Sequence, residues 1–237
     1  RQRPSRVAAV AKPEVRRTLT GILQGLAHGI DLWTIWRDFC EIAAITISNR
    51  VDLTHYDERE TRYLAIVKRY TRPQLDAFAR AFGTLVDQLE EGIDDVLGRA
   101  FMDLELGNKW AGQFFTPFHL CRLTAELQID DSLRAKVAER GYVTMADPAV
   151  GAGAFPLAMA AALRDAGINY QQALHVTCQD IDPKAIYMAY VQLSLCHVPA
   201  VLIVGDTLRA PGQGERWYTP AHVMGNWSGR LARKEAA

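Results

Sequence analysis

Three aspartates stand at the ends of short apolar runs and could bind the polar groups of a ligand. They are Asp147 after "YVTMA", Asp180 after "LHVTCQ" and Asp206 after "AVLIVG". The first begins "DPAVGAGAF", in which Gly151 and Gly153 let the backbone turn tightly and approach a ligand without a clash at Cβ. This turn has neither the GxGxxG spacing nor the lysine of a phosphate-binding loop. An aspartate at its start repels phosphate and favours a cationic amine accompanied by neutral hydroxyls.

The second aspartate narrows the choice of ligand. Asp180 ends an expected strand, where a carboxylate is placed to accept hydrogen bonds from ribose hydroxyls. A nucleoside that carries an amino-acid group satisfies both Asp147 and Asp180, and S-adenosylmethionine is such a molecule. The alternative is that both acids only cap the helices that follow them.

An alternation of strands and helices after Tyr142 would bring the three acids together. The expected strands are "YVTMAD", "LHVTCQD" and "AVLIVGD", and the helices between them are "FPLAMAAALRDAG" and "PKAIYMAYVQLSLCHV". This order predicts a βαβαβ unit with a parallel sheet. Ligands of such sheets bind beyond the carboxyl ends of the strands, so we expect the acids at one binding edge.

The first half of the chain has a different texture. Apolar residues recur there at three- and four-residue spacing, and no strand pattern interrupts them. Asp31 is placed to cap one of these helices, and we expect Trp33, Trp36 and Phe39 to pack in the core, the alternative being a base-stacking platform. We therefore predict an α/β protein with a helical domain over residues 1–107 and an α/β domain over residues 108–237.

Charge and cysteine usage limit the function classes. Lys and Arg number 27, as do Asp and Glu, so no global attraction to nucleic acid is visible. The four cysteines lack CxxC pairing and His-rich spacing, so we expect reduced thiols in a cytoplasmic protein, with no disulfide and no metal site. No apolar run reaches the length of a membrane span.

Four motifs in order resemble a known family. "DPAVGAGAF", "QDIDPKAIYMAYVQLSL" and "GDTL", with "GQFFTPFHL" upstream, resemble the adenine-specific amino-methyltransferases of DNA. The nearest likeness is the modification subunit of type I restriction systems. The resemblance covers roughly Gly107 to Leu208. It implies a Rossmann-like, S-adenosylmethionine-dependent methyltransferase fold, here with a partial parallel sheet behind the helical half, and DNA as a possible partner.

The resemblance also implies which residues hold the cofactor. The "GQFFTP" segment would shape the methionine side, the glycine turn would hold the amino-acid part, and the other two acids would bind the ribose and adenine ends. The implied cofactor-binding residues are Phe114, Thr116, Pro117, Asp147, Pro148, Gly151, Gly153, Phe155, Asp180, Ile181, Asp206 and Leu208. The alternative for "GQFFTP" is a plain turn with Pro117 in the first turn of a helix.

The catalytic signature of the family is missing. It consists of Asp, Asn or Ser, two prolines and an aromatic residue, and it aligns the target amine and stacks on the flipped base. At the corresponding place stands "YTPAHVMGNWSGRL". Asn226 would follow a short strand, "AHVMG", and Trp227 could stack on a base, so these two are the candidate catalytic residues. The alternative is a C-terminal loop.

The family's sheet also continues beyond what these 237 residues provide. A half sheet leaves an exposed edge strand, so we expect a homodimer or a partner subunit to cover it. Three functions stay open. The first is an S-adenosylmethionine-dependent DNA adenine N6-methyltransferase, and the second is an inactive homologue that acts by binding, for example in anti-restriction or as a partner subunit. The third is a remnant with an empty cleft.

Overall fold

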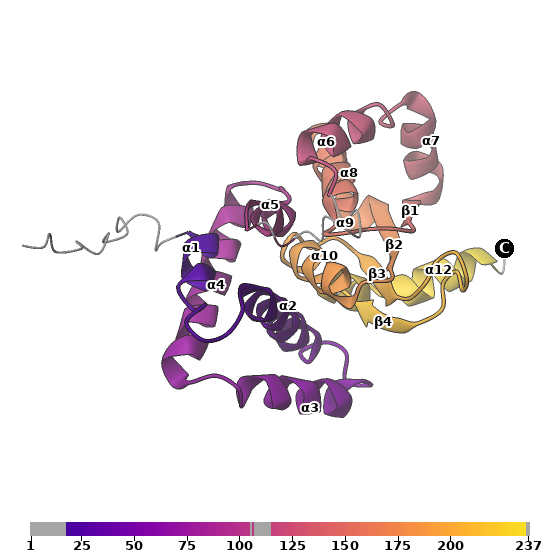
Figure 1. Ribbon diagram of the computed structural model, residues 1–237. Helices are drawn as coiled ribbons and strands as arrows, with labels where there is room; N and C mark the ends of the chain where they lie inside the picture. The colour runs from indigo at the N-terminus through magenta and orange to yellow at the C-terminus, as the bar shows by residue number, and fades with distance from the viewer. Residues whose placement is uncertain (1–17, 105, 107–114, 236–237) are drawn as a thin grey trace, which may run out of the picture.

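The computed structural model describes residues 18–104, 106 and 115–235 and has a mixed α/β fold. Helices alone form its first part, and a sheet with its covering helices forms the second (Figure 1). The expected domain boundary near residue 107 falls among residues 107–114, outside the described part. The division into two domains therefore stays a prediction.

Local capping signals explain where the first helices begin. The helices are α1 (Leu19–Gln24), α2 (Leu32–Ser48), α3 (Tyr56–Val67), α4 (Arg72–Glu91) and α5 (Val96–Asp103). Asp31 caps α2 as expected, because its carboxylate accepts the Thr34 N–H at 2.9 Å. Of the three aromatic residues near this start, Trp36 and Phe39 are buried as predicted, whereas Trp33 is 39% exposed and lies against the Lys184 ammonium.

The predicted strands are present and parallel. They are β1 (Val143–Asp147), β2 (Leu174–Asp180) and β3 (Ala200–Val204), and β1 pairs with β2 and β2 with β3. A further strand, β4 (Glu215–Tyr218), pairs antiparallel with β3, and the order across the sheet is β1-β2-β3-β4. The carboxyl ends of the three parallel strands therefore share one edge.

Helices precede each parallel strand, and two more end the described part of the chain. They are α6 (Phe118–Glu126) and α7 (Asp131–Arg140) before β1, α8 (Ala154–Asp165) and α9 (Tyr170–Ala173) before β2, α10 (Pro183–Leu195) before β3, and α11 (Pro220–Met224) and α12 (Trp227–Glu235) at the end. The sequence "AHVMG", expected as a strand, lies in α11. Thr219 caps this helix by accepting the His222 N–H. Pro220 fits the first position of the helix, because the backbone N–H that proline lacks has no partner within the helix at that position.

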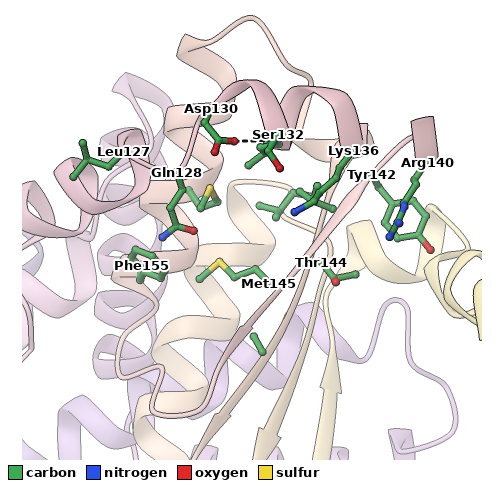
Figure 2. A pocket seen from close by; sticks show the side chains of 15 residues that line it. Leu127, Gln128, Asp130, Ser132, Lys136, Arg140, Tyr142, Thr144, Met145 and Phe155 are labelled. Atoms are coloured by element: carbon green, nitrogen blue, oxygen red, sulfur yellow. Dashed lines mark hydrogen bonds between the residues drawn. The ribbon is translucent and has the colours of Figure 1, made fainter. Parts of the chain in front are cut away.

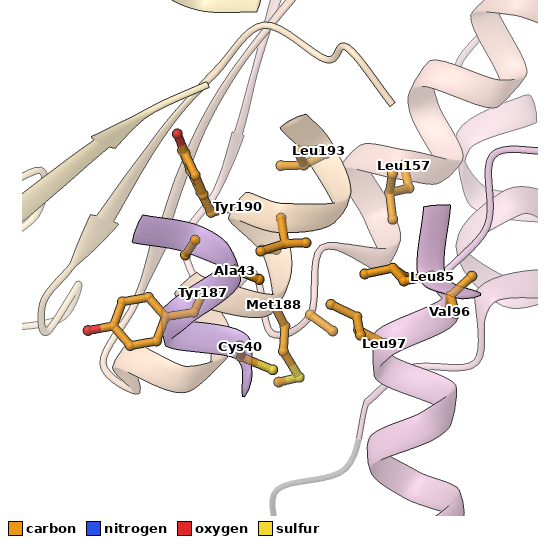
Figure 3. Packing of buried hydrophobic residues seen from close by; sticks show 14 of the residues in the cluster. Cys40, Ala43, Leu85, Val96, Leu97, Leu157, Tyr187, Met188, Tyr190 and Leu193 are labelled. Atoms are coloured by element: carbon orange, nitrogen blue, oxygen red, sulfur yellow. The ribbon is translucent and has the colours of Figure 1, made fainter. Parts of the chain in front are cut away.

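A single cluster of buried residues runs through both parts of the chain. Helix α10 lies between the sheet and α2, while α8 packs against α6 (Figure 1). Figure 3 shows the meeting of α2 with α10 and of α5 with α4 and α8, through Cys40, Ala43, Leu85, Val96, Leu97, Leu157, Tyr187, Met188, Tyr190 and Leu193. This shared core fixes α10, and with it the carboxyl end of β2.

Candidate functional site

The glycine turn and the second strand meet directly. The Gly151 N–H donates a hydrogen bond of 2.9 Å to Oδ2 of Asp180, whose Oδ1 accepts the Asp182 N–H at 3.0 Å. Asp147 stands at the end of the neighbouring strand, and its Oδ1 accepts the Ala149 N–H at 3.2 Å. The geometry thus brings Asp147 and Asp180 to one edge, as the βαβαβ pattern predicted.

The third aspartate joins the same edge through its loop. The Gly205 N–H donates to the Asp180 carbonyl at 2.9 Å, and the Thr207 hydroxyl donates to the Pro148 carbonyl at 2.7 Å. Asp206 itself accepts the Leu208 and Arg209 N–H groups at 3.0 and 3.2 Å. Its carboxylate therefore organises its own turn.

Both glycines of the turn adopt backbone conformations that other residues rarely reach. Gly151 has φ +56° and Gly153 has φ +96°. A Cβ on Gly151 would lie 2.9 Å from Cδ1 of Phe115, and one on Gly153 would lie 3.2 Å from Ala189 of α10. The first contact places the ring of Phe115, from the "GQFFTP" segment, against the turn.

The remainder of that segment lies at the start of α6. Thr116 and Pro117 are exposed, and Pro117 is the N-terminal cap of the helix. Phe114 lies outside the described residues. The ring of Phe115 is 5.2 Å from that of Phe101 in α5, so the helical part of the chain packs against this segment.

The electrostatics of the edge favour a cation. Burial raises the pKa of the Asp147 carboxyl, and the charge of nearby Asp180 raises it further, although the hydrogen bond from Ala149 lowers it. Among the residues that the structure describes, neither acid forms an ion pair. A cationic group bound here would offset the repulsion between the two carboxylates.

Two large apolar side chains that follow these acids in the sequence are exposed to solvent. Ile181 follows Asp180 and is 68% exposed, and Leu208 follows the third acid and is 96% exposed. Exposed apolar residues beside polar groups are typical of sites that hold a flat, partly apolar ligand. Phe155, expected beside the cofactor, lines the groove along β1 (Figure 2).

The family follows from a comparison with known proteins. A family model described as N-6 DNA methylase matches residues 99–227, more than half of the chain. The chain belongs to the N-6 DNA methylase family. A search among curated proteins gives no match. The matched range of this family member runs from α5 to the first residue of α12 and includes all three aspartates.

A buried glutamine supports the turn, and sequence reasoning missed it. Nε2 of Gln192 in α10 donates to the Ala152 carbonyl and to the Asp95 carboxylate, both at 2.9 Å, and its Oε1 accepts the Leu97 N–H at 2.9 Å. Gln192 has no exposed surface. An isolated polar residue within the apolar helix "AIYMAYVQLSL" was the available signal.

Of the two candidate catalytic residues, Asn226 is exposed, whereas Trp227 lies in a buried cluster. Trp227 has no exposed surface, and its ring lies 5.2 Å from those of Tyr142 and His175, with the Arg230 guanidinium 3.6 Å from its centroid. Tyr142 precedes β1 and His175 is the second residue of β2, so this cluster lies at the opposite end of the strands from Asp147. Trp227 cannot stack on a base there without leaving its packing site.

The cysteines and the acidic residues form no further candidate site among the described residues. The four cysteines are free and buried. Within the described ranges, no group of three or more His, Cys, Asp or Glu is arranged to hold a metal ion. In the described part of the chain, no helix combines the length and the apolar character that a membrane crossing requires.

Proposed function

We propose that this N-6 DNA methylase family member binds S-adenosylmethionine at the edge formed by Asp147, the glycine turn and Asp180, within a Rossmann-like methyltransferase domain. The observation that carries the proposal is the hydrogen bond between the Gly151 N–H and Asp180, which holds the turn against the second strand. Two neighbouring carboxylates suit a ligand that has both an amine and vicinal hydroxyls.

The residues take complementary parts in this proposal. Asp147 accepts hydrogen bonds from the ligand's amine. Burial and the charge of Asp180 raise the pKa of its carboxyl, and a bound cation would lower that pKa again. Asp180 uses one lone pair on each oxygen for the protein backbone, which leaves acceptor capacity for ribose hydroxyls. Ile181 and Leu208 flank the adenine, while Phe114, Thr116 and Pro117 border the methionine part.

When bound, the cofactor supplies a transferable methyl group on a sulfonium. For transfer to an adenine amine, the protein would have to align that amine with the methyl. The family's Asn-Pro-Pro-aromatic signature is missing from the sequence, and Trp227 is buried at the far end of the strands. We therefore favour a chain that binds the cofactor but does not methylate DNA by itself.

DNA enters the proposal through the family. An N-6 DNA methylase family indicates DNA as the class of substrate. We propose that this chain acts on or beside DNA as a binding or regulatory homologue, for example by imitating the modification subunit of a type I restriction system. A partner chain, or a second copy, would then cover the incomplete sheet.

Calorimetric titration with S-adenosylmethionine and S-adenosylhomocysteine tests the cofactor site. We expect binding by the wild-type chain and a loss of affinity of at least about ten-fold in Asp147→Asn and in Asp180→Asn, since each removes a charge-assisted acceptor. Asp87→Asn, at an exposed position of α4, is the matched control. Absence of binding at millimolar ligand by the folded wild-type chain would sink the proposal.

A methylation assay on adenine-containing DNA separates the two readings of function. We expect no methyl transfer by the isolated chain even when it binds the cofactor. Transfer by the isolated chain that persists in Asn226→Ala would mean that another residue aligns the amine. Transfer only after addition of a second polypeptide would identify the chain as one subunit of an enzyme.

A further inference from the structure

Two buried histidines connect an exposed serine to the sheet. Nε2 of His222 in α11 lies 2.9 Å from Oγ of Ser228, the second residue of α12. Nδ1 of His222 lies 2.9 Å from Nε2 of His175, the second residue of β2. Both histidines are buried, whereas Ser228 is exposed. Asp147 lies at the other end of the strands, so the proposed cofactor site does not include these three residues.

The position of the ring protons decides the role of the serine. Burial lowers the pKa of both histidines, so each ring is neutral at neutral pH and carries one proton. With its proton on Nδ1, His222 donates to Nε2 of His175, and its own Nε2 accepts the Ser228 hydroxyl. With the opposite tautomers, the serine is the acceptor. The first arrangement aims the serine proton at an unprotonated nitrogen.

The first arrangement has the order of groups that activates a serine nucleophile. A serine hydroxyl is a weak nucleophile unless a base within hydrogen-bond reach takes its proton. That base is effective when a third group fixes its tautomer and the orientation of its ring. Ser228, His222 and His175 occupy these three places at hydrogen-bond distances. Such a set of residues is defined by its geometry and not by the fold that carries it.

A cleft gives a small substrate access to the serine. It has a volume of about 270 Å³, and Ser228, His222 and Asn226 line it together with residues 51–54 of the α2–α3 connection. Two exposed apolar side chains, Leu53 and Val223, contribute to its lining. Pockets for drug-sized ligands measure about 300–1,000 Å³, so this cleft suits a smaller group, such as a short acyl chain.

The start of α12 offers donors for a negative charge beside the serine. Ser228 lies in the first turn of this nine-residue helix, whose first backbone N–H groups have no partner within the helix. Such groups stabilise the oxyanion that forms when a nucleophile adds to a carbonyl. Gly225 and Asn226, the latter with φ +49°, connect α11 to α12 and turn the chain so that Ser228 faces His222.

We propose that Ser228 is the nucleophile of an esterase site for short-chain carboxylic esters, with His222 as its general base and His175 as a positioning residue. Oγ of Ser228 adds to the ester carbonyl while Nε2 of His222 takes the hydroxyl proton. His222 then gives this proton to the alcohol oxygen as the bond between that oxygen and the carbonyl carbon breaks, which leaves an acyl-serine. Water, deprotonated by His222, releases the carboxylic acid and restores the serine.

A fluorophosphonate probe tests the nucleophile, because an activated serine Oγ displaces its fluoride and forms a bond to phosphorus. We expect the folded wild-type chain to be labelled at Ser228, as located by peptide mass spectrometry. Ser228→Ala should abolish the labelling. Ser132→Ala, at an exposed serine of α7, is the matched control and should keep it. Absence of labelling in the wild type, or equal labelling of Ser228→Ala, would overturn the proposal even if the chain binds S-adenosylmethionine.

Hydrolysis of p-nitrophenyl acetate tests the base and the size of the acyl group. We expect a burst of nitrophenolate in the wild type, and His222→Gln should slow it by about a hundred-fold or more at equal folded fraction. p-Nitrophenyl dodecanoate should react more slowly than the acetate, because its acyl chain is too long for the cleft. A burst that persists in Ser228→Ala would overturn the proposal. Because Ser228 is exposed, this variant should fold even where His222→Gln does not.

A pair of substitutions at His175 separates positioning from packing. His175→Gln keeps an acceptor for the Nδ1 proton of His222, whereas His175→Leu removes it. At equal folded fraction, measured by circular dichroism, we expect His175→Leu to lower the rate of fluorophosphonate labelling by about ten-fold or more and His175→Gln to restore most of it. Equal rates in the two variants would overturn the positioning role.

Discussion

The Gly151 N–H donates a hydrogen bond of 2.9 Å to the Asp180 carboxylate, although the two residues belong to different motifs, 29 positions apart. The bond makes the shape of the turn depend on the second strand. Phe115, 36 residues earlier in the sequence, lies against the turn, because a Cβ added to Gly151 would lie 2.9 Å from Cδ1 of its ring. Three separate segments thus define one small site.

Replacement of Gly151 tests this arrangement. In Gly151→Ala the new methyl group would lie 2.9 Å from Phe115, and the backbone would stay at φ +56°, which alanine rarely adopts. We expect a loss of stability of about 1 kcal/mol or more and a loss of cofactor affinity of at least about ten-fold. Urea denaturation and calorimetry measure the two effects.

Gly83→Ala is the control for that substitution. Gly83 lies inside α4, and a Cβ there meets nothing within 4 Å. Alanine should stabilise this helix by about 1 kcal/mol without a change in affinity. Equal affinities of Gly151→Ala and the wild type would show that the turn does not hold the ligand.

Loss of Gln192 should damage both the core and the turn. Gln192→Leu would leave the Ala152 carbonyl and the Leu97 N–H without their partner, and Asp95, whose pKa burial raises, would lose a donor. We expect a cost of about 2–4 kcal/mol in the free energy of unfolding, because buried polar groups become unsatisfied. Gln88→Leu, at an exposed position of α4, should change stability by less than about 0.5 kcal/mol.

The sequence predicted the parts of the fold that local signals specify. The three parallel strands and their helices follow from alternating apolar runs and a glycine turn, and the topology of a βαβαβ unit then places Asp147 and Asp180 at one edge. Asp31 as a cap was equally local. None of these needed knowledge of distant contacts.

The parts that were missed depend on distant contacts. Strand β4, "ERWY", carries two charged residues and forms beside Arg59 and Arg62, which come from a helix far earlier in the chain. Trp227 could not be assigned to a buried cluster because Tyr142 and His175, which enclose it, lie in separate segments. In the sequence alone, an aromatic residue next to an asparagine looks the same whether it lies in a loop, in an active site or in the core.

The histidine pair at the amino ends of the strands predicts acid sensitivity. Nε2 of His175 lies 2.9 Å from Nδ1 of His222, and burial lowers the pKa of the first to about 3 and of the second to about 4. The charge of the other histidine and of Arg230 lowers the pKa of His175 further. Around the pair lie Tyr218, Ser228 and Trp227.

The sign of the effect follows from proton uptake. Unfolding returns both histidines to an ordinary pKa near about 6.5, so below that pH the unfolded chain binds more protons than the folded chain. Stability should therefore be fully present above about pH 6.5 and fall as the pH drops toward 4, by up to about 1.4 kcal/mol per pH unit for each histidine. Asp95 and Asp147, whose pKa values are raised, contribute with the opposite sign.

Urea denaturation between pH 7 and pH 4.5 measures this slope, and a variant isolates the pair. His222→Gln should show a shallower loss of stability than the wild type over this range, while His28→Gln, at an exposed position, should keep the wild-type slope. Identical slopes in all three proteins would mean that the pair does not stay neutral in the folded state.

Trp227 and Asn226 offer the sharpest contrast between a structural and a catalytic role. Trp227→Ala should cost about 3–5 kcal/mol in the free energy of unfolding, because it empties a fully buried site between Tyr142, His175 and Arg230. Trp33→Ala, at a residue 39% exposed, should cost clearly less.

Asn226 has φ +49°, so Asn226→Gly should be tolerated. The folded fraction of each variant should keep wild-type affinity for S-adenosylmethionine, since the cluster lies at the other end of the strands; a selective loss of that affinity in Asn226→Gly would return this segment to the site.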